Sequence, residues 1–406
     1  MSFNYERKQF PLLYVHQHAR AIIGFGAGQI AAQECATYGI KHALIVTTGL
    51  KGTGIVEEVE GILKHAGIAV TIFSGVTTNP KDYEVAAGTK VFQEAGCDGV
   101  VSVGGGSSHD CGKAIRLYAT NDGPKTKIMD FAAFIEPSIA LKMPLLKEVR
   151  IPHIGIATTT GTGADGTHAC IITDTEANYK CICLSPGLIP NVSIVDPAYA
   201  RTQPNHLVAW TGMDAFLHCL EPFVGRLSMP FVRAVGLRGI KLVSENIRQA
   251  FANPKNDVAM ENMAQASFIA SMAYDMGGGM GMVHGLAHML SCLRDYHHGY
   301  SNAQTMMPVS RFNLPGAPER YQEIGEAMGL DVRYMSPFSA AEKTLEAIEK
   351  MRNDIGIAQL TSEQLALTEA ELEHIGKWCF NDISYEANPR DMNHADMKRI
   401  LTTITA

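Results

Sequence analysis

The sequence has few of the features that mark membrane-spanning, secreted or nucleic-acid-binding proteins. No uninterrupted apolar run reaches the ~18 residues that a membrane-spanning helix needs. The first residues, Met1 to Gln9, are polar and lack the apolar segment of a signal peptide. Lys and Arg form no cluster, and the net charge is -7. We therefore expect a cytoplasmic protein that binds neither a membrane nor nucleic acid.

Disulfide bonds and several common catalytic motifs are not expected either. The nine cysteines are scattered, contain no Cys-x-x-Cys, and cannot all pair because their number is odd. We expect reduced, packed thiols, including those of the one close pair, Cys181 and Cys183. The absence of His-Glu-x-x-His argues against a metalloprotease, and the absence of Gly-Lys-Ser/Thr argues against a P-loop.

The length and the order of the expected elements predict two domains. With 406 residues, the chain is too long for one compact core. In its first half, short apolar runs alternate with amphipathic helices, which is typical of a parallel sheet with right-handed crossovers. We expect strands over 42–47, 68–73, 99–103 and 154–157, and helices over 55–65, 83–95 and from the glycines at 104–106 to about Tyr118.

The pattern changes after Asp196-Pro197, where helical periodicity replaces strand signals. We expect helices over 205–223, 229–251, 258–274, 340–352 and 369–380. The sequence therefore predicts an α/β domain over residues 1–196 and an all-helical domain over residues 197–406. Because no flexible linker separates them, we expect the two domains to pack closely, with a ligand cleft between them.

A glycine-rich turn follows the third expected strand. Gly104-Gly105-Gly106-Ser107 lies between that strand and a helix, whose free N–H groups would face an anion. Asp110 and Lys113 fall in the first turns of the same helix. The glycines could serve only a tight turn between strand and helix. Three glycines in a row followed by serine nevertheless favour a diphosphate site.

Two other glycine-rich segments are also candidates. Gly24-Phe25-Gly26-Ala27-Gly28 resembles part of a dinucleotide fingerprint, but the strand signal before it is weak and the third spacing does not fit. Gly161-Thr162-Gly163 follows the expected strand at 154–157, so it is the better candidate for a second phosphate contact.

Aspartate and histidine recur at helical spacing in the second half. Asp214 and His218 are four residues apart, which stacks both side chains on one helix face. His284 and His288 repeat this spacing, and His297-His298 follows. One carboxylate and several imidazoles in an apolar context predict a divalent-metal site. The alternative is that these histidines are only packed within helices, and spacing alone leaves open whether His284 and His288 are a ligand pair.

Seven segments spread along the chain carry a resemblance to a known family. They are GGGSSHDCGKA (104–114), TTTGTGADGT (158–167), IVDP (194–197), GMDAFLHCLE (212–221), GMVHGLAHML (281–290), HHGYSNA (297–303) and NPR (388–390). In this order and spacing they resemble the iron-containing (type III) alcohol dehydrogenases over nearly the whole chain. Within that family, the sequence is most similar to the NAD-dependent methanol and 1,3-propanediol dehydrogenase branch.

The resemblance implies a fold and a set of site residues. The fold would be an N-terminal Rossmann-like α/β domain that binds a dinucleotide, followed by an all-α C-terminal domain, as in dehydroquinate-synthase-like proteins. The metal would be held by Asp214, His218, His284 and His298, while His288 would stay off the metal and relay protons beside the nicotinamide. The expected cofactor contacts are Thr48, Gly104, Gly105, Gly106, Ser107, Asp110, Thr158, Thr159, Thr162 and Lys180.

The chain departs from the family pattern at several positions. Thr47-Thr48-Gly49 stands where the family usually has an aspartate that binds the ribose 2′-OH, so NADP(H) is an alternative to NAD. Ala164-Asp165 replaces a small residue followed by glutamate. Ala169 stands where a larger residue of the substrate pocket is expected. Arg294 replaces a residue that is often aromatic. It is either a surface or ion-paired residue or, if it faces the cleft, favours an anionic or strongly polar substrate.

The sequence therefore predicts a metal-dependent oxidoreductase that transfers a hydride between NAD(P) and a small primary alcohol or aldehyde. The expected metal is Fe2+, with Zn2+ or Mn2+ as alternatives, and the likeness implies a homo-oligomer, a dimer or larger. Methanol, ethanol, 1,3-propanediol, lactaldehyde, 4-hydroxybutyrate and a small sulfonated aldehyde all fit this chemistry.

Two other functions are alternatives. One is a dehydroquinate-synthase-like lyase that uses NAD transiently. It would need several basic residues for a phosphate and carboxylate substrate, whereas the motifs here are poor in Lys and Arg. The other is a non-catalytic metal- or nucleotide-binding protein, which would bind its ligand without turnover.

Overall fold

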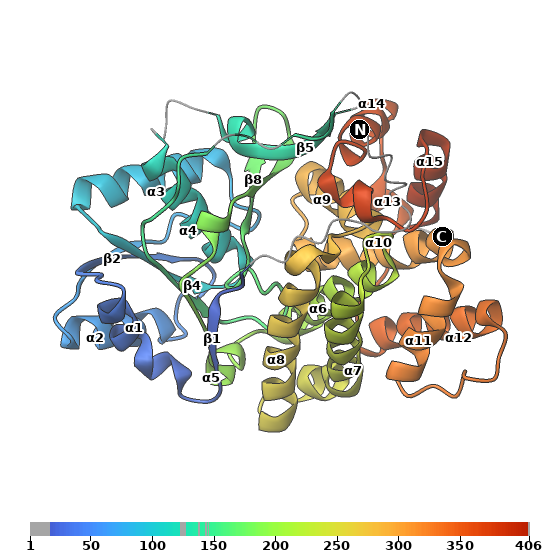
Figure 1. Cartoon of the computed structure of the whole chain (residues 1–406), viewed down its shortest axis with the longest axis horizontal. Helices are drawn as coiled ribbons and strands as arrows, with labels where there is room; N and C mark the ends of the chain where they lie inside the picture. The colour runs from blue at the N-terminus through green and yellow to red at the C-terminus, as the bar shows by residue number, and fades with distance from the viewer. Residues whose placement is uncertain (1–16, 122–126, 137–138, 143, 145, 405–406) are drawn as a thin grey trace, which may run out of the picture.

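The chain forms two lobes that lie side by side, an α/β lobe drawn in blue to green and a helical lobe drawn in green to red (Figure 1). The computed structural model describes residues 17–121, 127–136, 139–142, 144 and 146–404, so the polar start, Met1 to Gln9, lies outside the described residues. Within these ranges, no helix is long and apolar enough to cross a membrane.

A six-stranded parallel sheet forms the centre of the α/β lobe. Its strands, in spatial order, are β1 (Arg20–Ile23), β10 (Val192–Val195), β7 (His153–Ala157), β4 (Gly99–Gly104), β2 (His42–Thr47) and β3 (Ala69–Phe73). Successive strand residues point to opposite faces, so Ile45 of β2 joins one apolar cluster and Leu44 joins the other. Because both faces are buried, the central strands are the uninterrupted apolar runs seen in the sequence.

Helices cover both faces of this sheet. They are α1 (Ala31–Thr37) and α2 (Ile55–His65) on one face, and α3 (Asp82–Ala95) and α4 (Gly106–Thr120) on the other. Leu63 of α2 packs in the cluster that contains Ile45, whereas Val85 of α3 and Ile115 of α4 pack in the cluster that contains Leu44. The strands and helices predicted here are confirmed, with ends shifted by one or two residues.

A second, antiparallel sheet lies beside α4 and was not predicted. Its strands, in spatial order, are β6 (Ile139–Lys142), β5 (Ala132–Glu136), β9 (Tyr179–Leu184) and β8 (Ala169–Asp174). Cys181 and Cys183 alternate along β9, and both are buried. All nine cysteines are free, and all but Cys292 are buried.

The second lobe is helical, as predicted. Its helices are α5 (Pro197–Ala200), α6 (Asn205–Val224), α7 (Pro230–Ala252), α8 (Asp257–Ala273), α9 (Met282–Arg294), α10 (His298–Asn313), α11 (Pro318–Ala327), α12 (Pro337–Asp354), α13 (Ser362–Leu365), α14 (Glu369–Cys379) and α15 (His394–Thr403). Short helical turns occur in both lobes. In the first lobe they include η1 (Ala27–Ile30), η3 (Ile128–Phe131) and η4 (Pro186–Leu188), and in the second η5 (Tyr274–Gly278), η6 (Leu314–Gly316) and η7 (Ile383–Ala387). The five predicted helices correspond to α6, α7, α8, α12 and α14. The remaining helices fall within the predicted all-helical domain, but the sequence analysis gave no bounds for them.

The turn after β7 joins the two lobes. A Cβ atom at Gly161 would lie 2.2 Å from the carbonyl oxygen of Thr211 in α6, so only glycine allows this approach. Gly163 has a φ of 59° and packs against Ser271 of α8. A few residues further on, His168 donates from Nδ1 to Asp275 of η5 over 2.6 Å. The carboxyl end of β7 therefore rests directly on the helical lobe.

Candidate metal and cofactor site

Four side chains from three helices of the second lobe converge on one point. Asp214 and His218 lie on α6, His284 lies in the first turn of α9, and His298 begins α10. The Nε2 atoms of the three histidines lie 3.7, 3.6 and 3.7 Å from Oδ1 of Asp214, in that order. All four candidate ligand atoms lie within 4.8 Å of one another. In a tetrahedral shell with ~2.1 Å bonds the ligand atoms are roughly 3.4 Å apart, so the set fits a divalent cation.

Glu221 supports this cluster and was not singled out from the sequence. One of its oxygens accepts from the backbone N–H of Val283 over 2.7 Å, and the other accepts from Nδ1 of His284. Its approach depends on Gly281, where a Cβ atom would lie 2.6 Å from Oε1 of Glu221. Glu221 follows His218 by three residues on α6, and this shared helix face is the signal that could have revealed it.

In two of the three histidines, a hydrogen bond at one ring nitrogen determines which nitrogen is left for a cation. His284 uses Nδ1 for Glu221, and His218 uses Nδ1 for the backbone oxygen of Gly161 at 3.4 Å. In both residues Nε2 remains, and it faces Asp214. Outer partners of this kind fix the tautomer and ring orientation of metal-binding histidines.

The charges in the cluster are tightly linked. Burial would raise the pKa of Asp214, but the surrounding histidines, His218 first, hold it below its usual value. Burial also works against a charged His284, yet Glu221 and Asp214 raise its pKa to about 9. Burial lowers the pKa of His218 to about 4 and lowers that of His298 as well. Two neutral imidazoles and one carboxylate beside His284 form a donor set that suits a divalent cation.

His288 lies one turn beyond His284 on α9 but outside the four-residue cluster. Its Nδ1 donates to Asp382 over 2.7 Å, and the other oxygen of Asp382 accepts from the backbone N–H of Ser384 over 2.8 Å. Its Nε2 is buried and has no hydrogen-bond partner within the described part of the chain. The ring stacks on that of His298, with centroids 5.2 Å apart. Asp382 was not identified from the sequence.

The predicted phosphate turn lies at the junction of β4 and α4. The backbone N–H of Thr158 donates to the carbonyl oxygen of Gly104 over 2.9 Å, which joins the ends of β7 and β4. A Cβ atom at Gly105 would lie 2.9 Å from Thr159, and one at Gly106 would lie 3.1 Å from Thr162. The two turns predicted as phosphate contacts therefore face each other, and the first of them contains the N-terminus of α4.

The β2 loop also reaches this turn. The backbone N–H of Thr48 donates to Oγ of Ser108 over 3.1 Å, directly after the predicted contact Ser107. The structure thus brings the end of β2 beside the ends of β4 and β7.

Asp110 and Lys180 interact electrostatically with each other, and Lys180 also with Asp214. Burial raises the pKa of Asp110 to about 6, although Lys113 and Lys180 oppose the shift. Burial lowers the pKa of Lys180, and the carboxylates of Asp110 and Asp214 both act on it in the opposite direction. Its Nζ donates to Oδ1 of Asn79 over 2.8 Å. Lys113 points elsewhere, because its Nζ donates to Thr167 and to the carbonyl oxygen of Ala169.

The segment at 24–28 lies apart from this site. It follows β1, which is separated from β4 by β10 and β7. The N–H of Gly28 donates to Asp196 over 3.0 Å, and a Cβ atom at Gly28 would overlap Tyr199. These contacts give Gly28 a packing role.

The residues that depart from the family pattern can be placed in the structure. Arg294 forms an ion pair with Glu371 and donates to the carbonyl oxygen of Ala366, so the ion-paired alternative is the one observed. Asp165 accepts a hydrogen bond from Ser193. Ala169 begins β8.

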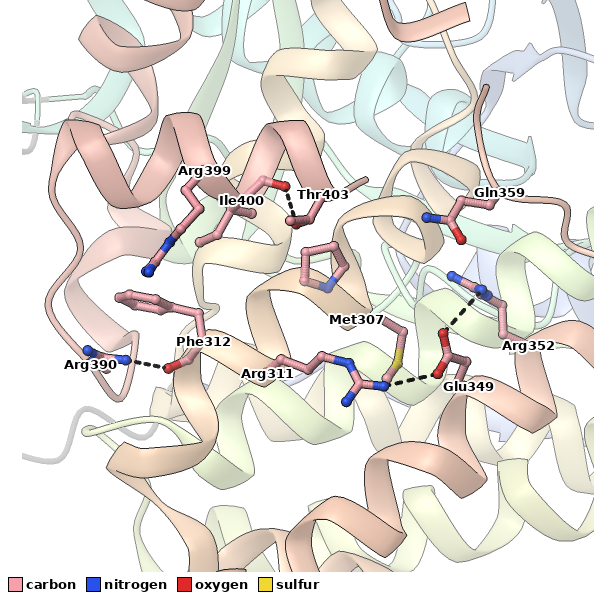
Figure 2. A pocket seen from close by; sticks show the side chains of 11 residues that line it. Met307, Arg311, Phe312, Glu349, Arg352, Gln359, Arg390, Arg399, Ile400 and Thr403 are labelled. Carbon is pink, nitrogen blue, oxygen red and sulfur yellow. Dashed lines mark hydrogen bonds and ion pairs between the residues drawn. The ribbon is translucent and has the colours of Figure 1, made fainter. Parts of the chain in front are cut away.

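A separate pocket of about 480 Å³ lies between α10, α12 and α15 (Figure 2). Arg311 and Arg352 both face Glu349, and Arg390 donates to the carbonyl oxygen of Phe312. The residues from α10, Met307 to Phe312, come from the opposite end of that helix from His298. The pocket is therefore distinct from the candidate metal site.

Comparisons with known proteins agree with the geometry. The family model described as iron-containing alcohol dehydrogenase matches residues 18–197, and that for the C-terminal part of the Fe-containing alcohol dehydrogenase family matches residues 208–405. The chain is 37% identical over 380 residues to 1,3-propanediol dehydrogenase of Klebsiella pneumoniae, covering 93% of this chain and 95% of that protein. It is 34% identical over 382 residues to NAD-dependent methanol dehydrogenase of Bacillus methanolicus, covering 94% and 97%.

A crystal structure of 1,3-propanediol oxidoreductase has the same fold. It matches with a TM-score of 0.88 and 35% sequence identity over 97% of this chain and 100% of that chain. The resemblance read from the seven motifs is thus confirmed in sequence and in structure. The chain belongs to the iron-containing alcohol dehydrogenase family and is an oxidoreductase.

Proposed function

We propose that this chain interconverts small primary alcohols and their aldehydes, with NAD as hydride carrier and Fe2+ as the resident metal. The observation that carries the proposal is the cluster of Asp214, His218, His284 and His298, whose candidate ligand atoms lie within 4.8 Å of one another. The turn at 158–163 connects this cluster to the glycine turn of β4, because Gly161 contacts α6 and Thr158 contacts Gly104. The proposed metal ligands and the proposed cofactor contacts are thus connected through the turn at 158–163.

Each residue set has a proposed role. The four clustered residues hold the metal, which supplies a Lewis acid that polarises the substrate oxygen when bound. His288 relays the hydroxyl proton through Nε2, because Asp382 occupies its Nδ1. The proposed cofactor contacts are Thr48, Gly104, Gly105, Gly106, Ser107, Asp110, Thr158, Thr159, Thr162 and Lys180.

NADP is the alternative cofactor, because no carboxylate stands at Thr48 to repel a 2′-phosphate. Zn2+ and Mn2+ are the alternative metals, since imidazole and carboxylate ligands suit all three ions. The domain boundary is proposed at Asp196, which caps α5. The first matched family segment ends at residue 197 and the second begins at residue 208, which supports this boundary.

We further propose a cytoplasmic homo-oligomer that acts on small molecules. Free thiols at all nine cysteines support the compartment. The exposed aromatic side chains of Tyr334 and Phe338, 92% and 54% exposed, support a partner surface. Light scattering of the purified protein would test the assembly, and a monomer at micromolar concentration would contradict it.

The test is a turnover assay on protein loaded with Fe2+. The absorbance of the reduced nicotinamide is followed with NAD+ or NADP+ and a panel of short alcohols, and in reverse with their aldehydes. Turnover is expected to disappear when EDTA is added. Asp214→Ala should lose both turnover and bound metal, whereas His288→Ala should lose turnover and keep its metal. His206→Ala, at an exposed histidine of α6, is the matched control and should keep full activity.

Other outcomes would identify the alternatives. Ligand binding without turnover for any alcohol or aldehyde would favour the binding protein or the dehydroquinate-synthase-like lyase. Full metal content in Asp214→Ala would contradict the ligand assignment, and unchanged turnover in His288→Ala would contradict the proton relay.

A further inference from the structure

Asn302 reaches into the metal cluster without a role in the function proposed above. It lies one turn after His298 on α10, and its side chain is fully buried. Its Nδ2 atom lies 2.7 Å from Oδ1 of Asp214, 3.0 Å from Nε2 of His284 and 3.1 Å from Nε2 of His298. The amide nitrogen thus contacts three of the four candidate ligand atoms.

The orientation of this amide follows from its neighbours. An amide nitrogen only donates, and its oxygen only accepts. Turning the amide over would place its oxygen against the carboxylate of Asp214, so the donor end faces the cluster. The nitrogen has two hydrogens for three neighbours, and the shortest contact is to the charged acceptor, Asp214.

Metal binding would change only part of this arrangement. Nε2 of His298 has one lone pair, which a cation takes, so the amide would lose its hydrogen bond to that ring. A carboxylate oxygen has a second lone pair, so Oδ1 of Asp214 can bind a cation and still accept from Asn302. The hydrogen bond to Asp214 therefore fits the loaded and the unloaded site alike.

We propose that Asn302 is a positioning residue of the metal centre, which fixes Asp214 for the cation and donates to Nε2 of His298 until the cation arrives. This inference rests on the proposed metal function. Residues that orient a metal ligand typically change metal affinity by roughly tenfold to a hundredfold when replaced. We expect a loss of that size when the amide is removed.

The test measures metal binding directly. Protein stripped with EDTA is titrated with Co2+ and with Zn2+ in competition with a coloured chelator, for wild type, Asn302→Leu and Asn302→Ala. Leucine has nearly the shape of asparagine but cannot donate. We expect both variants to bind each metal roughly tenfold to a hundredfold more weakly, with a changed visible spectrum of bound Co2+ because the Asp214 oxygen is no longer fixed.

Thr305→Val is the matched control. Thr305 is fully buried on the next turn of α10, and its hydroxyl donates only to backbone oxygens. It should keep the wild-type metal affinity and Co2+ spectrum. NADH binding and circular dichroism should stay unchanged in Asn302→Leu, because the change lies on the metal side of the site.

The outcomes separate the two proposals. If wild type binds both metals, Asp214→Ala does not, and Asn302→Leu matches wild type in affinity and spectrum, the role of Asn302 is overturned while the metal centre stands. If Asp214→Ala binds metal as wild type does, the proposed metal centre itself fails. If Thr305→Val loses as much affinity as Asn302→Leu, the effect comes from packing in α10 and the positioning role is overturned.

Discussion

Three histidines in or beside the metal cluster have Nδ1 occupied by an oxygen acceptor. His284 donates to Glu221, His218 to the backbone of Gly161, and His288 to Asp382. In each ring, Nε2 is the nitrogen left for a metal or a substrate. The acceptors therefore decide which nitrogen each histidine presents.

Replacing Glu221 by glutamine tests this control at one residue. Glu221→Gln keeps the shape, but its NH2 group must face either Val283 N–H or Nδ1–H of His284, which are both donors. We expect metal affinity to fall by roughly tenfold to a hundredfold, measured by chelator competition. Glu346→Gln, at an exposed position of α12, is the control. Equal affinity in the two variants would contradict the argument.

Metal affinity should rise with pH up to about 9. In the metal-free site the pKa of His284 is about 9, since Glu221 and Asp214 outweigh the opposing effect of burial. Below that pH the ring carries a proton that a cation must displace, so acid weakens binding. One displaced proton corresponds to about a tenfold gain per pH unit. Calorimetry in two buffers of different ionisation enthalpy would count the proton, and no release at pH 7 would refute this.

The residues of the site could be predicted only in part. Helical spacing brought out Asp214, His218 and the pair His284 and His288, but it did not say which of them bind metal. The resemblance supplied that assignment, which remains a proposal. Asp382 escaped notice because it lies 94 residues after His288 and no local pattern connects them.

At the scale of elements, the turns after β4 and β7 approach each other closely because two glycines at their contact have no side chain. A Cβ atom at Gly105 would lie 2.9 Å from Thr159, and one at Gly106 would lie 3.1 Å from Thr162. The helix α4 can therefore start close to the opposite turn, with its N-terminal N–H groups free for an anion.

Gly105→Ala should push the turn after β4 away from the turn after β7. We expect NADH affinity to fall by about tenfold, because Thr159 must move and the backbone of the proposed phosphate turn moves with it. Fluorescence titration measures the effect. Gly61→Ala is the control, since Gly61 is exposed on α2 with open space at its Cβ position. It should leave NADH affinity unchanged and add about 0.5 to 1 kcal/mol to the free energy of unfolding. Equal NADH affinities would argue against Gly105 as a cofactor contact.

Elements with a single clear pattern were predictable, and the others were not. Strands β2, β4 and β7 are buried on both faces and appear as apolar runs. The edge strand β1 has only four residues, none of them fully buried, so its signal is weak. Helix α10 is buried on nearly all sides and contains Pro308, so its sequence has no amphipathic stripe. The helix that provides His298 was therefore not predicted.

At the scale of the molecule, polar contacts connect the two lobes. Asp275 of η5 is buried, and it accepts from the backbone N–H and from Nδ1 of His168, which precedes β8. Each lobe also has apolar residues of its own, so these contacts mainly set how the lobes meet.

Asp275→Ala should lower the free energy of unfolding by about 3 kcal/mol, because it leaves two partly buried donors of His168, the backbone N–H and Nδ1, without this acceptor. Urea unfolding measures the change. Asp331→Ala, at an exposed position, is the control and should stay within about 0.5 kcal/mol of wild type. A loss below 1 kcal/mol in Asp275→Ala would show that apolar packing alone sets the contact between the lobes.

The pairing of His288 with Asp382 has a consequence for the timing of biosynthesis. The ribosome synthesises α9 long before it reaches Asp382, the partner of His288. The same is true of Asn388, whose side chain accepts from the backbone N–H of Met282 at the start of α9. The α/β lobe, complete by β10, can fold while the rest is still being translated. The histidine proposed to relay protons gains its orientation only near the end of translation. We therefore expect the nascent chain to form the proposed cofactor site first and to gain activity only after its last helices have emerged.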